Sequence, residues 1–275
     1  MAKPSIYDHP EVYEAVVRAP MEQIESEVAS IIRLLAQRGI YKGRVLELAC
    51  GTCPHGILLA RQGFSVHGVD LSPNILAVAA KRAEAGGVQI GLHQADIVDL
   101  HLDVGPFDCA IFMAETFPLI TRYEDLISHF ASVRRHLRPG GLYVVDVDAH
   151  RHGVGTRYQV WGEKRVALDD GYVDLWHEDF PGDWVQGTSH LVMHCRIHRG
   201  DSTVETEDEW RVRVDSPWHL ELLLRTLPGW SLAGFYSWRD LSTDITDEAH
   251  YFMVVEALAG EDEPRPNKCC KPTSP

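Results

Sequence analysis

The chain has 275 residues, of which 45% are hydrophobic and 24% charged, values typical of a globular protein with one large domain or one domain that carries an insertion. Its formal net charge of −14 argues against a nucleic acid as partner, because phosphate binding depends on clustered lysine and arginine. No apolar run approaches the roughly 18 residues that span a bilayer, and the N-terminal MAKPSIYDHP lacks the apolar core of a signal peptide. We expect a cytoplasmic protein that binds neither membrane nor nucleic acid, and the oligomeric state is left open.

The first predicted element is a helix over residues 20–38. Pro20 and the glutamates that follow it are a typical helix start, and the apolar residues recur at helical spacing. The residues of this apolar face are Ile24, Val28, Ile31, Ile32 and Leu35. We assign residues 1–40 to an N-terminal helical cap.

Residues 41–150 form the second predicted unit. Short apolar runs alternate here with helical stretches, which predicts a parallel sheet covered on both faces. The predicted strands are RVLELAC, SVHGVDL, VQIGLHQADI, FDCAIFMA and LYVVDVD, and the predicted helices are 55–62, SPNILAVAAKRAEAG and EDLISHFASVRRHLRPGG.

The pattern changes after residue 150. YVDLWHEDF, SHLVMHCRIHRG and TVETEDEWRVRVD alternate with period two, and Gly200-Asp201 is a plausible hairpin turn, so residues 151–216 are predicted as an antiparallel sheet with one face in water. Residues 217–259 add a capped helix, SPWHLELLLRTL, and the strands GWSLAGFYSW and HYFMVVEAL. The polar, proline-rich residues 260–275 are predicted to be disordered, and the role of Cys269 and Cys270 there is left open.

The glycine turn in VLELACGTCPHG indicates a ligand site. Asp70 ends the second predicted strand, 19 residues after Gly51, and Asp96 ends the third, while Glu47 lies within the first. Ligands of open parallel sheets bind at the carboxyl ends of the strands, where a carboxylate can accept from both ribose hydroxyls. Cys53 stands where dinucleotide-binding proteins have a second glycine that admits a pyrophosphate. A nicotinamide dehydrogenase is therefore disfavoured, and a phosphate-free adenosyl ligand is favoured.

On these motifs, in this order over residues 44–148, the chain resembles the class I S-adenosylmethionine-dependent methyltransferases of the small-molecule type. The resemblance rests on VLELACGT, GVDLS, ADI, FDCAIFM and LRPGGLYVVDV. It implies a Rossmann-like, doubly wound, mainly parallel seven-stranded sheet with an antiparallel β lid inserted after the fifth strand. Cys53 and Pro54 depart from the family's glycine motif.

The resemblance also implies roles for individual residues. Asp70 would hold the ribose hydroxyls, Asp96 would accept from the adenine amino group, and Glu47 would hold the turn or the methionine amine. The methionine moiety would meet Gly51 and its neighbours Ala49, Thr52 and Cys53. Leu71 would pack on the adenine with Ile97 flanking Asp96, and Met113 would also contact the cofactor.

Two other readings of the turn are weaker. Cys50, Cys53 and His55 could suggest zinc, but structural zinc takes four ligands in paired clusters and no second cluster is present in the sequence, so no metal is expected. Cys53 as a nucleophile would need a base and an orienting group nearby. We expect the cysteines to be small buried apolar residues without a disulfide framework.

Candidates for the acceptor side lie outside the turn. In similar methyltransferases an N-terminal helix with tyrosines folds over the cofactor, so Tyr7 and Tyr13 could orient an acceptor or contact the methionine carboxylate; packed aromatic residues are the alternative. Glu115, after the fourth strand, and His150, after the fifth, could each act as a general base, or be an ordinary loop carboxylate and an exposed histidine.

Residues 163–215 hold 13 acidic and 6 basic side chains, a net charge of −7, with interleaved tryptophans. Such a lid could favour a cationic or amine acceptor, but a solvated acidic face with the tryptophans packed beneath it is the favoured explanation. The predicted function is methyl transfer to an N, O or S atom of a small molecule. The alternatives are aminopropyl transfer from the same cofactor and a non-catalytic, regulatory S-adenosylmethionine-binding protein.

Overall fold

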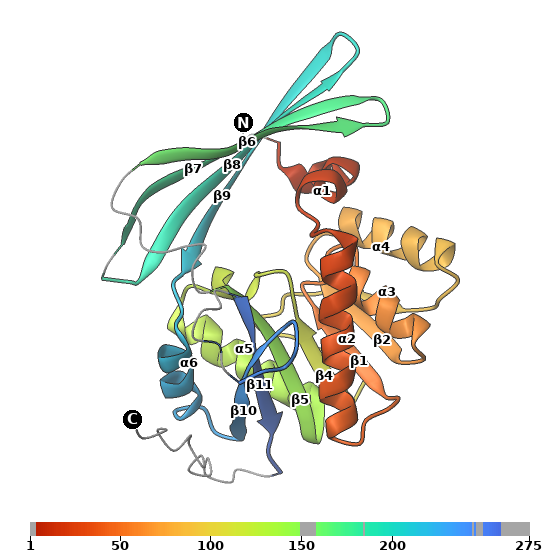
Figure 1. The fold of residues 1–275 in the computed structure, drawn as a ribbon, viewed down its shortest axis with the longest axis vertical. Coiled ribbons are helices and arrows are strands. Elements are labelled where there is room, and N and C mark those ends of the chain that lie inside the picture. The colour runs from red at the N-terminus through yellow and green to blue at the C-terminus, as the bar shows by residue number, and fades with distance from the viewer. Residues whose placement is uncertain (1–3, 149–157, 184, 244, 246–249, 260–275) are drawn as a thin grey trace.

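The computed structural model describes residues 4–148, 158–183, 185–243, 245 and 250–259 (Figure 1). Its larger sheet has seven strands in the order β10-β11-β5-β4-β1-β2-β3. Strand β11 is antiparallel to both of its neighbours and the other pairs are parallel, which confirms the predicted doubly wound sheet. The strands are β1 (Arg44–Leu48), β2 (Ser65–Asp70), β3 (Gly91–Gln94), β4 (Phe107–Phe112), β5 (Leu137–Asp148), β10 (Trp230–Ser237) and β11 (His250–Ala257).

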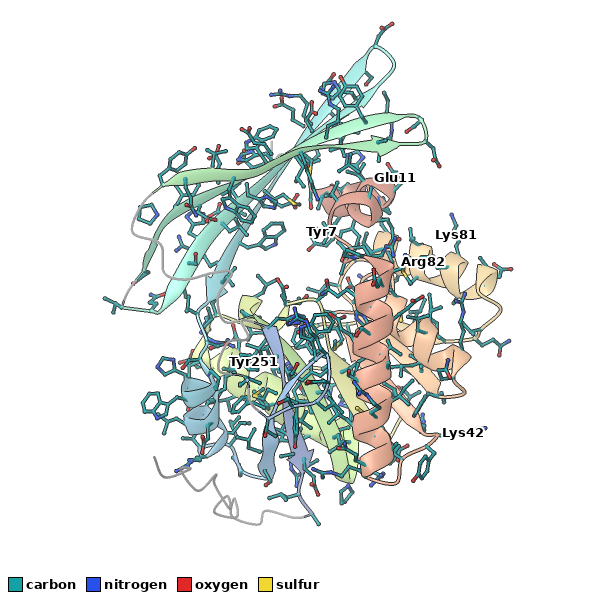
Figure 2. All side chains as sticks on the ribbon, viewed as in Figure 1. Tyr7, Glu11, Lys42, Lys81, Arg82 and Tyr251 are labelled. Carbon is teal, nitrogen blue, oxygen red and sulfur yellow. The ribbon has the colours of Figure 1, made fainter. Side chains whose placement is uncertain are left out.

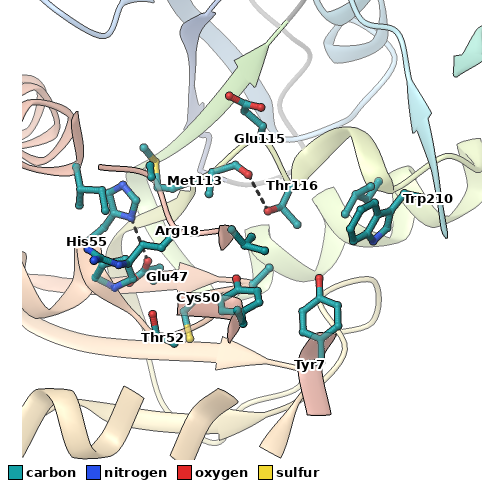
Figure 3. A pocket seen from close by; sticks show the side chains of 18 residues that line it. Tyr7, Arg18, Glu47, Cys50, Thr52, His55, Met113, Glu115, Thr116 and Trp210 are labelled. Atoms are coloured by element: carbon teal, nitrogen blue, oxygen red, sulfur yellow. Dashed lines mark hydrogen bonds and ion pairs between the residues drawn. The ribbon is translucent and has the colours of Figure 1, made fainter. Parts of the chain in front are cut away.

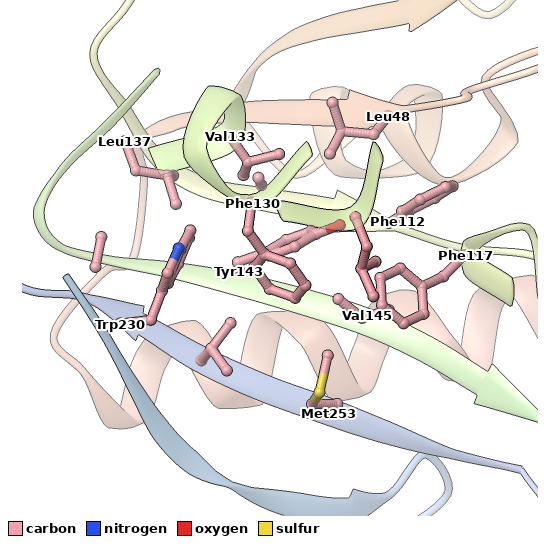
Figure 4. Close-up of a cluster of buried hydrophobic side chains, with 14 of the residues drawn as sticks. Leu48, Phe112, Phe117, Phe130, Val133, Leu137, Tyr143, Val145, Trp230 and Met253 are labelled. Carbon is pink, nitrogen blue, oxygen red and sulfur yellow. The ribbon is translucent and has the colours of Figure 1, made fainter. Parts of the chain in front are cut away.

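Helices cover both faces of this sheet because successive strand residues point to opposite sides. Val45 joins the cluster that contains helix α2 (Met21–Gln37), whereas Leu46 joins the cluster that contains α5 (Tyr123–His136) and α6 (Pro217–Leu224). On the second face Phe130, Tyr143 and Trp230 stack edge to face or tilted, with ring centroids 5.7 to 5.9 Å apart (Figure 4). Helices α3 (Pro54–Arg61) and α4 (Pro73–Ala85) follow β1 and β2.

The smaller sheet is the predicted lid, with four antiparallel strands in the order β6-β7-β8-β9. These are β6 (Gln159–Leu168), β7 (Gly171–Asp183), β8 (Thr188–Arg199) and β9 (Ser202–Arg213). Leu191, Met193, Cys195 and Ile197 are buried, as the alternation predicts. Strand β6 was not predicted, because most of its side chains are exposed and it has no regular apolar alternation.

The N-terminal segment is divided between the two sheets. Helix α2 packs on the larger sheet, but the short helix η1 (Ile6–Asp8) and α1 (Pro10–Val16) cover the inner face of the lid with Ile6 and Val12 (Figure 2). Asp208 of β9 fixes this contact by accepting from Ser5 Oγ at 2.5 Å and from the Ile6 N–H at 2.9 Å. Residues 4–16 therefore pack on the lid, and Tyr13 and Glu14 of the same segment also contact the main domain.

Two predicted boundaries differ from the structure, and one short turn is additional. Strand β3 ends at Gln94, so Asp96 follows it by two residues and does not end it. Helix α5 ends at His136, and Pro139 and Gly140 lie within the irregular start of β5. The η2 turn (Phe117–Leu119) was not predicted. His150 and residues 260–275 lie outside the described residues, and no described helix is long and apolar enough to cross a membrane.

Candidate functional site

Two adjoining cavities lie at the carboxyl ends of β1, β4 and β5, where the strand order reverses. The smaller, of about 180 Å³, is lined by the glycine turn, the tyrosines of the N-terminal segment and the residues that follow β4 (Figure 3). The larger, of about 450 Å³, extends toward the inner face of the lid. Arg18, His55, Glu115 and Trp210 line both. Parallel-sheet proteins bind ligands at this position.

The glycine turn after β1 has a tightly coiled backbone. Ala49, Gly51 and Cys53 have φ angles of 45°, 54° and 57° in the left-handed region. The Gly51 N–H donates to Asp70 Oδ2 at 2.8 Å, and a Cβ at Gly51 would lie 2.8 Å from the hydroxyl oxygen of Tyr13. The turn therefore needs glycine at position 51 for both its conformation and its contact with Tyr13.

Glu47 holds this turn from below. The buried carboxylate accepts from the Gly56 N–H at 2.7 Å and from the Cys53 thiol at 3.0 Å. The predicted turn-holding role of Glu47 fits this geometry, whereas Cys53 has its side chain under the turn and lines neither cavity. Hydrogen bonding with Cys50 and burial beside Glu47 raise the pKa of the Cys53 thiol well above its usual range, which argues against a nucleophilic role.

His55 is part of a buried ion-pair network and not of a zinc cluster with the cysteines. Its Nε2 lies 2.7 Å from Glu27 Oε2, and its Nδ1 lies 3.6 Å from Glu47 Oε1. Burial lowers the pKa of His55, but the hydrogen bonds to the two glutamates outweigh this effect and raise it to about 9. The imidazolium thus neutralises carboxylates from α2 and β1 beneath the smaller cavity.

The turn after β4 carries the predicted base Glu115. Ala114 and Glu115 have φ angles of 60° and 56°, and both residues line the two cavities. The Glu115 N–H donates to Asp146 Oδ2 at 3.1 Å, and His250 Nε2 pairs with Asp146 Oδ1. Met113, which directly follows β4, lines the smaller cavity.

In the part of the chain that the structure describes, one group of three residues brings its polar atoms close enough to surround a cation. The atoms belong to Glu27, Asp146 and His250 and lie within 4.8 Å of one another. Both carboxylates already accept two hydrogen bonds, from Gln23 and His55 for Glu27 and from the Glu115 N–H and His250 for Asp146. We therefore interpret the group as an ion-pair network.

Tyr7 and Tyr13 form one wall of the smaller cavity, with ring centroids 5.5 Å apart. Burial, with the nearby charges of Asp208 and Asp70, raises the pKa of Tyr7 to about 12, and burial raises that of Tyr13 further. At neutral pH both hydroxyls remain protonated, so they can donate hydrogen bonds but are poor bases.

The residues predicted for the adenosine lie at the ends of β2 and β3, beside the cavities and not within their lining. Asp70 Oδ1 accepts from the Ser72 N–H at 2.9 Å, and Asp96 Oδ1 accepts from the Val98 N–H at 2.8 Å. Leu71 is 64% exposed and Ile97 is half-buried. Thr52, predicted for the methionine moiety, does line the smaller cavity, where it is buried and donates to Glu14 of α1. Adenosine binding by these residues remains a prediction.

Residues 45–141 match the family model of a methyltransferase domain. They form a class I S-adenosylmethionine-dependent methyltransferase domain. A putative methyltransferase, YqeM of Bacillus subtilis, is 36% identical over 51% of this chain and 55% of its own length. The dTDP-4-amino-2,3,4,6-tetradeoxy-D-glucose N,N-dimethyltransferase of Saccharopolyspora spinosa is 28% identical over 52% of this chain and 56% of its own. The chain thus spans about half the length of the curated relatives it matches.

Solved structures extend the likeness in fold to most of the chain. An S-adenosylmethionine-dependent methyltransferase from Clostridium acetobutylicum superposes with a TM-score of 0.74 over 92% of this chain and 98% of that one, at 18% identity. The sugar N-methyltransferase KedS8 from Streptoalloteichus gives 0.71 over 94% and 95%, also at 18% identity. The lid is therefore part of a shared architecture.

Arg18 gives the smaller cavity a cationic group whose hydrogen-bonding capacity is not filled by the residues that the structure describes. Its Nε and Nη1 are nearly inaccessible and have no hydrogen-bond partner among the described residues; Nε lies 3.3 Å from Glu14 Oε2 without hydrogen-bond geometry. A guanidinium in this position suits the carboxylate of the methionine moiety. Arg18 was missed from the sequence because it lies between α1 and α2, outside any motif. Glu27, Asp146 and His250 were missed too, although the acidic Asp146 in a buried strand was a usable signal.

Proposed function

We propose that this chain transfers the methyl group of S-adenosylmethionine to an amine nitrogen of a small molecule. The observation that carries the proposal is the lining of the larger cavity, where the carboxylate of Glu115 lies with the rings of Trp161 and Trp210. Glu27 and Asp146 also line it but are paired with imidazoles, and Arg18 and Lys164 complete its charged lining. Carboxylates and indole faces both attract a cation, so an ammonium group is the chemistry that suits this lining. Relatives named as N-methyltransferases of amino sugars support the same class of acceptor.

Each part of the site has a distinct task in this reaction. Arg18 and the turn around Gly51 would hold the methionine end of the cofactor, and Asp70, Leu71, Asp96 and Ile97 the adenosine. Bound S-adenosylmethionine supplies an activated methyl group on a sulfonium, so the protein mainly has to align the acceptor and exclude water. In this proposal Glu115 takes the proton that the acceptor ammonium loses before its nitrogen attacks.

Calorimetry tests the cofactor half of the proposal. We expect S-adenosylmethionine and S-adenosylhomocysteine to bind and NAD not to bind. Asp70→Ala removes the partner of the Gly51 N–H and the proposed ribose acceptor, and loss of hydrogen bonds to a charged group costs about 1.5–3 kcal/mol, or roughly 10–150-fold in affinity. An unchanged dissociation constant would remove Asp70 from the site.

Turnover tests the acceptor half. With S-adenosylmethionine and a panel of amines, phenols, thiols and carboxylates, we expect methylation of amines such as D-glucosamine or glycine and not of the other classes. Binding of S-adenosylmethionine without methylation of any probe would support the non-catalytic alternative. Release of methylthioadenosine in place of S-adenosylhomocysteine would support aminopropyl transfer, and methylated phenols alone would overturn the amine assignment.

A further inference from the structure

The turn at Ala114 and Glu115 has an unusual backbone for its sequence. Two successive residues that are not glycine have φ near +60°, a conformation that costs free energy and persists only when surrounding structure enforces it. Both residues line both cavities, on the side where the acceptor meets the cofactor in the proposed function. A contact must therefore hold the turn in place.

Asp146 supplies that contact. It is 1% exposed and lies near the end of β5, where its Oδ2 accepts from the Glu115 N–H at 3.1 Å. Its other oxygen pairs with Nε2 of His250, the first residue of β11. One carboxylate thus connects the turn after β4 to two neighbouring strands of the sheet, β5 and β11.

We propose that Asp146 and His250 are a positioning pair that fixes the Ala114–Glu115 turn, so that the Glu115 carboxylate meets the acceptor. The inference rests on the proposed function. Asp146 does not itself touch the acceptor in this view; it acts through the backbone of Glu115. His250 acts one step further away, by orienting Asp146 and balancing its charge.

The surroundings of His250 explain why its charge matters. Asp146 from β5, Glu27 from α2 and Glu115 after β4 all act on the imidazole, and the ring of Trp238 packs against it with centroids 5.3 Å apart. Glu27 is itself paired with His55 of α3, and Lys164 of β6 lines the larger cavity together with Glu27, Glu115 and Asp146. Burial lowers the pKa of His250, but Asp146 and the other carboxylates raise it to about 8. An imidazolium at neutral pH therefore offsets a group of carboxylates that would otherwise repel one another.

The decisive variants separate the charge of His250 from its hydrogen bond. In His250→Gln the amide nitrogen keeps a donor for Asp146 but loses the charge, and in His250→Leu both are lost. Asp146→Asn presents an amide N–H₂ to His250, and the pair Asp146→Asn with His250→Gln restores a donor facing an acceptor. His101→Gln, at an exposed histidine elsewhere, is the matched control.

Hydrogen exchange of the Glu115 amide tests the positioning without any acceptor. We expect exchange at least tenfold faster in Asp146→Asn and His250→Leu than in the natural chain. His250→Gln and His101→Gln should stay within about twofold. Calorimetry should give S-adenosylmethionine affinities within about threefold in all four variants, because the pair lies on the acceptor side. Equal protection of the Glu115 amide in every variant would overturn the proposal.

Methyl transfer to D-glucosamine, or to the best amine of the panel, tests the consequence. We expect kcat to fall at least tenfold in Asp146→Asn and His250→Leu, with partial recovery in the double variant. The natural chain should lose kcat above about pH 8, where His250 loses its charge. His250→Gln keeps the donor without the charge, so it should show at every pH the kcat that the natural chain has above pH 8. A kcat unchanged by Asp146→Asn while amines are methylated would sink the positioning pair and leave the proposed function standing. Faster exchange of the Glu115 amide in Asp146→Asn and His250→Leu, with no methylation of any amine by the natural chain, would do the reverse. Activity abolished by EDTA and restored by a divalent metal would also overturn the pair, in favour of a metal centre.

Discussion

The two sheets of this protein place their polar side chains in opposite ways. In the seven-stranded sheet, buried carboxylates gather at the carboxyl ends of the strands, where Glu47 and Asp146 are each 2% exposed or less. In the lid, charged residues recur along whole strands on the outer face, as with Arg196 and Glu205, which are 45% and 61% exposed. The inner face of the lid is mainly apolar and packs on the N-terminal segment.

The difference shows where each sheet contributes to the site. A carboxylate buried at a strand end must be satisfied by specific donors, and those donors fix the turns that line the cavities. The charged side chains on the outer face of the lid remain in water, so they contribute little to the free energy of unfolding. The main sheet therefore determines the geometry of the site, whereas the lid encloses it and supplies Trp161 and Trp210.

The largest expected effect is that of Glu47→Ala. It leaves the Gly56 N–H without its acceptor and removes one of the two carboxylates beside the His55 imidazolium, and breaking such a buried pair costs about 3–5 kcal/mol. Urea unfolding measures the loss. The control is Glu256→Ala, which breaks a part-exposed pair between Glu256 Oε2 and Arg38 Nη1 at 2.7 Å. It should lower the free energy of unfolding by less than about 1 kcal/mol. Similar losses in both variants would contradict the contrast between buried and exposed charges.

A smaller loss should appear as a dependence of stability on pH. The pKa of His55 is raised in the folded protein to about 9 from 6.5, so its stabilising contribution is complete below pH 6.5 and is lost as the pH rises through 9. Unfolding free energies measured between pH 6 and 10 should fall over this window in the natural chain, and less steeply in His55→Gln. Parallel curves for the two proteins would show that His55 is not charged in the folded state.

A substitution on the inner face of the lid should lower the free energy of unfolding by less than Glu47→Ala does. Asp208→Ala removes the acceptor for Ser5 Oγ and the Ile6 N–H, and leaving a buried N–H unpaired costs about 1–3 kcal/mol. We expect faster proteolysis before Tyr7 and a lower free energy of unfolding. If the N-terminal segment kept its resistance to protease, the anchoring role of Asp208 would be wrong.

The smallest effect belongs to the outer face of the lid. Arg196→Ala breaks an exposed pair with Glu205 at 2.8 Å, and such pairs contribute about 0–1 kcal/mol. Thermal unfolding and S-adenosylmethionine affinity should both match the natural chain. A clear loss of either would mean that the outer face has a role beyond solvation.

Much of the fold could be predicted because its signals are local. The alternation of Val45 and Leu46 between opposite faces, the turn at Gly51 and Asp70 at the end of β2 all lie within one strand–helix–strand unit. The period-two pattern of Leu191, Met193 and Cys195 likewise marked the lid. The exposed strand β6 has no such pattern and was missed.

The acceptor side could not be predicted to the same degree because its parts are far apart in sequence. Asp146 pairs with His250 across 104 positions and with the Glu115 N–H across 31, and only the folded sheet brings them together. At Cys53, in contrast, a local sequence motif was visible but misleading. Its position in the motif indicated a ligand contact, but its thiol points to Glu47 because the left-handed backbone turns the side chain inward.

The N-terminal segment has a consequence for protein engineering. Residues 4–16 pack under the lid, while Tyr13 lies against Gly51 and Glu14 pairs with Thr52 and with Arg82 of α4. The lid and the glycine turn therefore cannot be exchanged independently of each other. A chimera that grafts a relative's lid onto this core has to import that relative's first helix as well, together with a turn shaped to receive it.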